Sequence, residues 1–131
     1  MNRRQWMAML ALLAPASGCV AAAAGAGAAG AIYVLDRGVE STVTTDVANT
    51  ELAVKRSFRD LGITETRSAT DREAGSEKRT LEGKKDDRDV SVSIETAGTG
   101  SKVVVIVKRS AVTWDKDMAR QIMEKIIAEA K

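Results

Sequence analysis

The sequence has no histidine, a single cysteine, one proline and few aromatic residues. Histidine is the commonest general base and metal ligand in proteins, so its absence removes the usual basis of both functions. One cysteine cannot form a disulfide within the chain. Serine and threonine are plentiful, but without a histidine or a motif-placed lysine none has the features of an activated nucleophile. The composition therefore predicts a protein that is not an enzyme, with no catalytic residue, no cofactor and no metal site.

Charge is distributed very unevenly along the chain. Arg3 and Arg4 are the only charged residues before Asp36, whereas residues 32–131 carry 18 basic and 18 acidic side chains. A neutral segment has no general attraction for nucleic acid, so we expect no nucleic-acid partner. Its 100 residues are enough for one small folded domain with a modest core.

The first 18 residues have the three-part layout of a secretory signal peptide. A short basic start ends at Arg4, an apolar stretch runs over residues 6–14, and small residues follow Pro15. Nine apolar residues are too few to span a bilayer. We therefore expect residues 1–18 to be a cleaved signal.

The residue after this segment is Cys19, and the run Ala16-Ser17-Gly18-Cys19 resembles the bacterial lipobox. On that resemblance, the Cys19 thiol receives a diacylglyceryl group, and signal peptidase II recognises Ala16, Ser17 and Gly18 and cuts before Cys19. Leu is commoner than Ala at the place of Ala16. Two or more acyl chains, of the palmitate type, anchor a protein stably. The resemblance thus implies a lipoprotein whose partner is the membrane, reached through lipid on Cys19.

Two other interpretations of this region stay open. Residues 1–18 could be a plain signal peptide with Cys19 incidental, or residues 6–35 could be an uncleaved membrane helix, although Pro15 and four glycines interrupt it. If the lipobox operates, residues 19–31 are the lipidated cysteine and an Ala/Gly-rich tether. Such a tether spans roughly 20 Å as a flexible coil.

The residue after Cys19 bears on which membrane would hold the protein. In Gram-negative lipoproteins, Asp at this position tends to retain the protein in the inner membrane. Because this chain has Val20 there, we expect the outer membrane, with the domain facing the periplasm.

Residues 32–131 predict a small α+β domain of order β-α-β-β-β-β-α. One strand, or two short ones joined near Gly38, is expected over residues 32–45, and a helix from Asp46 to Gly62. Further strands are expected over 63–69, 76–84, 90–94 and 103–107, and a closing helix from about Asp115. Short turns at 85–88 and 98–100 imply an antiparallel sheet of about four to five strands, with two helices packed on one face.

The same patterns predict parts of the core. Tyr33, Phe58 and Trp114 supply the aromatic bulk of the domain, and Leu52 widens the apolar face of the first helix. The apolar run at 103–107 indicates a strand covered on both faces or nearly so. Residues 86–89 contain three aspartates, but their spacing is that of a solvated turn and not of a calcium loop.

The whole chain resembles a group of small bacterial lipoproteins catalogued only as a domain of unknown function. The resemblance rests on Ser17-Gly18-Cys19, the Ala/Gly tether, Tyr33-Val34, the helix over 46–61, the turn Gly83-Lys84-Lys85-Asp86 before Val90, and the closing helix. It implies a localisation and a fold but no activity.

We therefore expect a membrane-anchored bacterial envelope lipoprotein. Its domain would have a non-catalytic structural or protein-interaction role and a protein partner in the envelope. The alternative is a periplasmic binding module for a lipid or a small apolar ligand, with its site on the sheet face opposite the helices.

Overall fold

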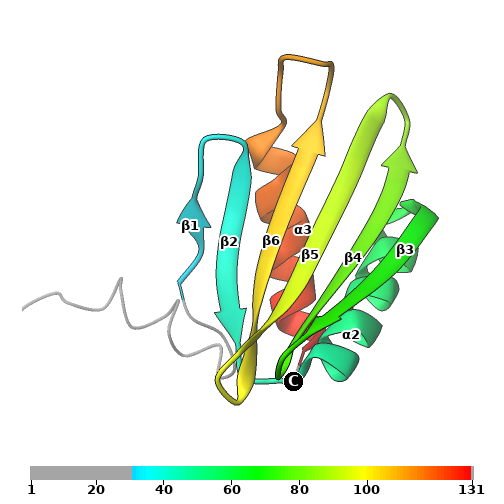
Figure 1. Ribbon diagram of the computed structural model, residues 1–131. Coiled ribbons are helices and arrows are strands. Elements are labelled where there is room, and N and C mark those ends of the chain that lie inside the picture. Colours follow the sequence, from blue (N-terminus) through cyan, green and yellow to red (C-terminus); the bar gives the residue numbers. More distant parts are fainter. Residues whose placement is uncertain (1–30, 131) are drawn as a thin grey trace, which may run out of the picture.

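The computed structural model describes residues 31–130, which form one sheet backed by two helices (Figure 1). In chain order the elements are β1 (Tyr33–Val34), β2 (Gly38–Val43), α2 (Val47–Leu61), β3 (Thr64–Glu73), β4 (Ser76–Lys85), β5 (Arg88–Ala97), β6 (Gly100–Lys108) and α3 (Lys116–Glu129).

The sheet is antiparallel throughout and has the strand order β1-β2-β6-β5-β4-β3. The α+β class, the antiparallel pairing and the two helices are confirmed. The expected four to five strands are too few, because the described sheet has six. Residues 32–45 form two strands and not one: the amide of Leu35 donates to the carbonyl of Gly38 at 2.8 Å, and this turn folds β1 back onto β2.

The β3–β4 hairpin is longer than its sequence pattern indicates. Each strand has ten residues, where about seven to nine were expected, and Gly75 supplies the turn with φ of 81°. Most side chains of β3 are exposed and polar. The strand is held by backbone hydrogen bonds to β4 and not by a buried apolar face. Its sequence therefore shows no alternation of apolar and polar residues.

Both helices begin at the aspartates that the sequence marks as caps. The Asp46 carboxylate accepts a hydrogen bond from the amide of Asn49 at 2.8 Å, and the Asp115 carboxylate accepts one from the amide of Met118 at 2.9 Å. Helix α2 ends at Gly62, which has the left-handed φ of 71° that glycine tolerates best. These three boundaries are confirmed.

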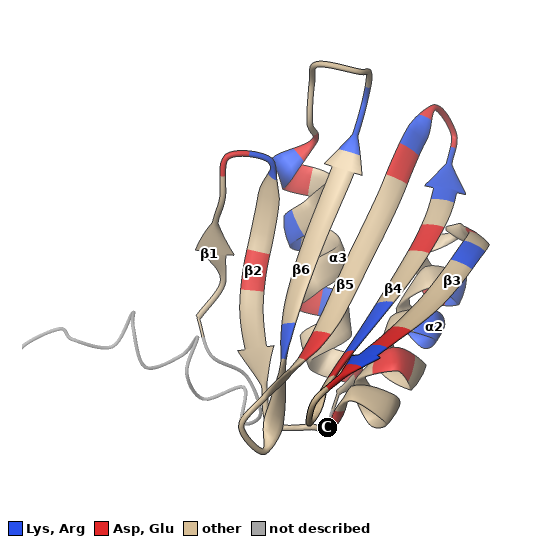
Figure 2. Cartoon of the chain, viewed as in Figure 1, with Lys and Arg blue, Asp and Glu red and all other residues tan. Residues whose placement is uncertain are grey.

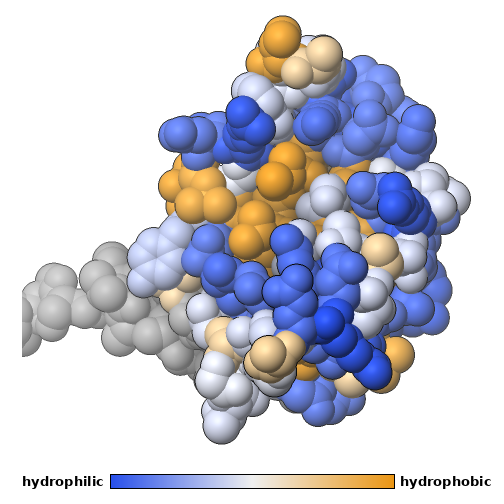
Figure 3. Space-filling view, viewed as in Figure 1, coloured by the Kyte–Doolittle hydropathy of each residue, from blue (hydrophilic) through white to orange (hydrophobic). Residues whose placement is uncertain are grey.

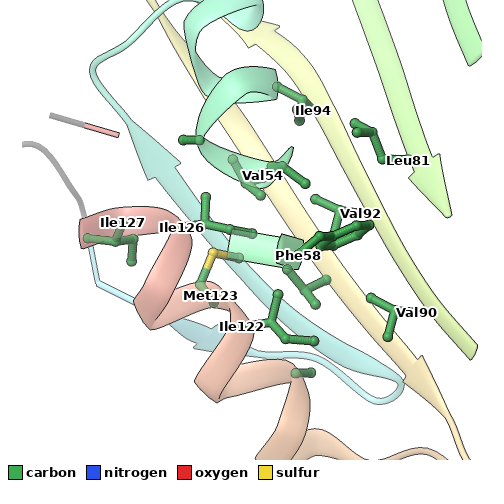
Figure 4. Close-up of a cluster of buried hydrophobic side chains, with 14 of the residues drawn as sticks. Val54, Phe58, Leu81, Val90, Val92, Ile94, Ile122, Met123, Ile126 and Ile127 are labelled. Carbon is green, nitrogen blue, oxygen red and sulfur yellow. The ribbon is translucent and has the colours of Figure 1, made fainter. Parts of the chain in front are cut away.

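The core lies between the sheet and the helices. Figure 4 shows side chains of α2, α3, β4 and β5 pointing toward one another across this layer. Among residues 31–130, Phe58 is the one aromatic residue in the core, since Tyr33 is 64% exposed and Trp114 is only partly buried. Leu52 is 49% exposed, so its expected place on the packed face of α2 is wrong. Its position on the helix faces away from the sheet.

Strand β6 is packed on one face and partly covered on the other. Val103, Val105 and Val107 are fully buried beneath the helices, whereas Val104 and Ile106 on the opposite face are partly exposed. The expected burial of β6 is therefore confirmed for the face beneath the helices, whereas the opposite face is only partly covered. No helix lies over the second face of the described sheet (Figure 1).

Candidate interaction surface

The sheet face that the helices leave uncovered, here called the open face, carries both apolar and polar side chains. Strand alternation directs Val104 and Ile106 of β6 to it, with Ser91 and Ser93 of β5 beside them. Figure 3 shows this face with hydrophobic residues near its centre and hydrophilic residues around them. The open face is thus neither uniformly polar nor a continuous apolar sheet surface.

Trp114 covers one end of the open face. It pairs through an isolated β-bridge with Lys108, the last residue of β6, so its ring lies on the same side of the sheet as Ile106. The guanidinium carbon of Arg37 lies 5.2 Å from the centre of the indole ring, within the range of a cation–π contact. The indole nitrogen is shielded from solvent and has no hydrogen-bond partner in the described part of the chain.

A pocket of about 450 Å³ opens beside this tryptophan. Its apolar part comes from Ile106 and the indole, and its charged rim includes Arg37, Glu82 and Lys84. That volume is within the usual range of small-molecule sites. The rim is electrically mixed, because Lys84 pairs with Asp89 at 3.6 Å, so the pocket does not select strongly for either sign of charge.

An ion pair joins the start of β5 to the start of α3. The guanidinium of Arg88 at the start of β5 donates to the Asp115 carboxylate at 2.7 Å, and the same carboxylate caps α3. The hydrogen bond from Arg88, with the backbone amide of Met118, lowers the pKa of Asp115. Asp115 therefore fixes the start of α3, and with it the chain that carries Trp114.

A second charged cluster joins α2 to the sheet. Arg79 on β4 donates to Glu77 at 2.8 Å and also pairs with Glu51 of α2. Burial of Glu51 opposes its ionisation, but hydrogen bonds from Arg79 and Lys55 outweigh burial and lower the pKa of this carboxyl. Every charged side chain of this cluster has a partner of opposite charge. We therefore interpret the cluster as a structural link between α2 and the sheet.

The residues predicted for lipidation and cleavage, Cys19 with Ala16, Ser17 and Gly18, lie outside the described residues. The aspartates of the β4–β5 turn are placed as expected of a turn: Asp86 has a positive φ of 55°, and Asp87 pairs with Arg88. Within residues 31–130, no three acidic or cysteine side chains gather closely enough to hold a metal ion. The helices in that range are all too short or too polar to cross a membrane.

The pairing of Arg37 with Trp114 is the feature that the sequence did not reveal. Seventy-seven positions separate the two residues, and only the packing of β1–β2 beside β6 brings them together. The sequence did indicate that Trp114 lies at an end of the sheet, because this residue stands between the most apolar strand and the cap of the last helix. The sequence alone did not indicate which face it covers.

These features define a small two-layer α+β protein with an antiparallel sheet open on one face. Residues 5–129 match the family described as "Protein of unknown function (DUF3568)", and the chain belongs to this family. The expected membership of a domain-of-unknown-function family is thereby confirmed, while its lipoprotein character is not tested by the match. No curated protein and no solved structure matches the chain.

Proposed function

We propose that this protein is a bacterial envelope lipoprotein, anchored through lipid on Cys19, whose domain has a structural or protein-interaction role and performs no catalysis. The sequence Ala16-Ser17-Gly18-Cys19, with the only cysteine of the chain at the end of a signal-like segment, carries the anchoring part of the proposal.

The open face carries the interaction part. It exposes part of Val104 and Ile106 on an otherwise polar surface, and protein interfaces commonly have such an apolar centre within a polar rim. Trp114 and Arg37 lie at its end, and these two residue types are enriched among the side chains that dominate binding energy. The absence of histidine from the chain is consistent with a role that needs no general base.

The anchor is tested by the intact mass of the protein isolated from bacterial membranes, for the wild type and for Cys19→Ala. We expect the wild type to lack residues 1–18 and to carry the mass of a lipidated cysteine. We expect Cys19→Ala to lack the lipid. A full-length, unmodified wild-type mass would refute anchoring through Cys19. Separation of inner and outer membranes on a density gradient then tests the outer-membrane location that Val20 favours.

The interaction role is tested by photo-crosslinking in the living envelope. A photoreactive residue at Ser93 probes the open face, and one at exposed Arg56 on α2 is the matched control on the opposite layer. We expect a discrete adduct from position 93 and none from position 56. Adducts of equal yield from both positions, or from neither, would contradict an interaction through the open face.

The pocket beside Trp114 favours a second candidate, a binding module for a lipid or small apolar ligand. Its volume of about 450 Å³ suits a small ligand, and Ile106 with the indole supplies an apolar wall. Native mass spectrometry of the purified protein tests this candidate. A retained ligand that Ile106→Asp abolishes would favour it, and a ligand-free mass after gentle purification would count against it.

A further inference from the structure

Exposed apolar side chains are concentrated at one end of the described domain. Five large hydrophobic residues are exposed in residues 31–130, and only Leu52 lies in the helical layer. Three of the other four are consecutive in the segment where the chain enters the fold, with Tyr33 64% and Val34 54% exposed. The fourth is Val112, which is 75% exposed and lies in the loop between β6 and α3.

The loop that carries Val112 is closed by its own hydrogen bonds. The amide of Arg109 donates to the carbonyl of Thr113 at 3.0 Å, and the hydroxyls of Ser110 and Thr113 lie 2.7 Å apart. The loop projects beyond the end of the sheet (Figure 1), and hydrophobic atoms form its tip at the top of Figure 3. Val112 thus contributes nothing to the core and is held outward by a defined turn.

The entry segment and this loop are neighbours. Arg37, which follows the exposed entry residues, lies 5.2 Å from the ring of Trp114 at the base of the loop. Figure 1 shows the β1–β2 turn and the β6–α3 loop at the same end of the molecule. We call residues 33–37 and 108–114 together the docking edge.

The docking edge carries three basic residues and one acidic residue, and Lys116 lies just beyond it. None of the basic residues Arg37, Lys108, Arg109 and Lys116 forms an ion pair within residues 31–130. Acidic residues also lie at this end of the sheet: Asp115 is held by Arg88, whereas Asp36, Asp86 and Asp117 form no ion pair within residues 31–130. Figure 2 shows basic and acidic positions side by side around the β1–β2 turn and the β6–α3 loop. Exposed apolar tips with tyrosine, tryptophan and flanking cations are the combination that the headgroup region of an anionic bilayer accommodates best.

We propose that the docking edge contacts the surface of the lipid bilayer beside the anchor and so orients the domain on the membrane. This inference rests on the anchoring at Cys19 proposed above. Twelve residues separate Cys19 from Ile32, and as a coil they span roughly 20 Å. From Ile32 the chain rises about 10 Å along β1 to the β1–β2 turn. The bilayer is therefore within reach of the edge, and the contact points the β3 side of the sheet away from the membrane.

A weak contact is sufficient because the tether keeps the edge close to the lipid. Once Cys19 is anchored, contact between the docking edge and the bilayer is intramolecular. A short flexible linker then gives an effective concentration in the millimolar range. A few apolar side chains and four cations would not hold a free domain on a membrane, but they suffice to orient a tethered one. The open face then lies beside the bilayer, where a membrane-bound partner can reach it.

The test places Trp114 as the only tryptophan of the full chain, through Trp6→Phe, in vesicles of phosphatidylethanolamine and phosphatidylglycerol. Quenching by brominated lipid reports whether the indole reaches the headgroup region. The matched control moves the tryptophan to exposed Thr70 on β3, with Trp6→Phe and Trp114→Phe. Five strand spacings, about 24 Å, separate β3 from β1. We expect quenching and a blue-shifted emission for Trp114 and neither for the tryptophan at position 70.

Val112→Asp changes only an exposed residue and should reduce the quenching of Trp114 to the level of the control. Equal quenching at positions 114 and 70, or a Trp114 signal unaffected by Val112→Asp, would overturn the proposal. Two other results would also overturn the proposal: a blue shift of Trp114 without lipid quenching, and a blue shift that depends on the protein-to-lipid ratio. Either result would indicate that the docking edge contacts a protein partner or a second copy of the chain. The intact mass of the same sample reports lipidation of Cys19, so failure of the anchor and failure of the edge are read separately.

Discussion

Phe58 and Leu52 lie on the same helix and both fit its apolar spacing in the sequence, but the fold gives them opposite environments. Phe58 is 2% exposed and points from α2 toward β4 and β5, while Leu52 is 49% exposed. Truncating a buried phenylalanine to alanine removes its transfer free energy and leaves a cavity, at a cost of about 3–5 kcal/mol. Truncating a half-exposed leucine away from the core changes stability by about 0.5 kcal/mol. We therefore expect Phe58→Ala to be at least several times more destabilising than Leu52→Ala.

The size of this effect matters because a domain of this length is stabilised by only about 5–15 kcal/mol. Phe58→Ala would leave a marginal fold, so Phe58→Leu, expected to cost about 1–1.5 kcal/mol, provides a measurable intermediate step. Urea unfolding of residues 31–131, followed by far-ultraviolet circular dichroism, gives the midpoint and the slope for each variant. The slopes should remain equal. A Leu52→Ala variant that loses as much stability as Phe58→Ala would refute the placement of these two residues, and with it the packing of α2 on the sheet.

Two further predictions concern stability. Gly83→Ala should lower the free energy of unfolding by about 1–3 kcal/mol in the same assay, because an added Cβ would lie 2.7 Å from Ile63 Cγ2 and 2.9 Å from the Thr64 carbonyl oxygen. The control is Ser91→Ala on the open face, which should be nearly neutral. Acid should unfold the domain partly through Glu51 and Asp115. Their pKa values are lowered in the fold, so their contributions are complete above the ordinary values of 4.5 and 3.8 and are lost as the pH falls through the lowered values. A Glu51→Gln, Asp115→Asn double variant should therefore show a shallower loss of stability below pH 4.5 than the wild type, and an unchanged slope would contradict the role of these carboxylates.

The parts of the fold that were predicted correctly have local physical causes. Asp46 and Asp115 satisfy free amides at helix starts, and Gly62 adopts the left-handed conformation that ends α2. The alternation of Val90, Val92 and Ile94 marks one buried strand face whatever the strand pairs with. These signals depend only on residues within one or two turns of each other, so the sequence alone determines them, together with the antiparallel pairing that short turns impose.

The remaining features were decided by tertiary structure. Strand β3 pairs through its backbone, so its polar sequence does not reveal its ten-residue length, and the exposure of Leu52 and Tyr33 depends on where the neighbouring layer ends. Contact between Arg37 and Trp114 requires β1–β2 to pack beside β6, a relation between residues far apart in the chain. The sequence by itself determined the signal-like segment, the single cysteine that follows it and a neutral α+β domain. Only the tertiary structure decided which face of the sheet stays open and which end of the domain gathers its exposed apolar side chains, because both depend on long-range packing.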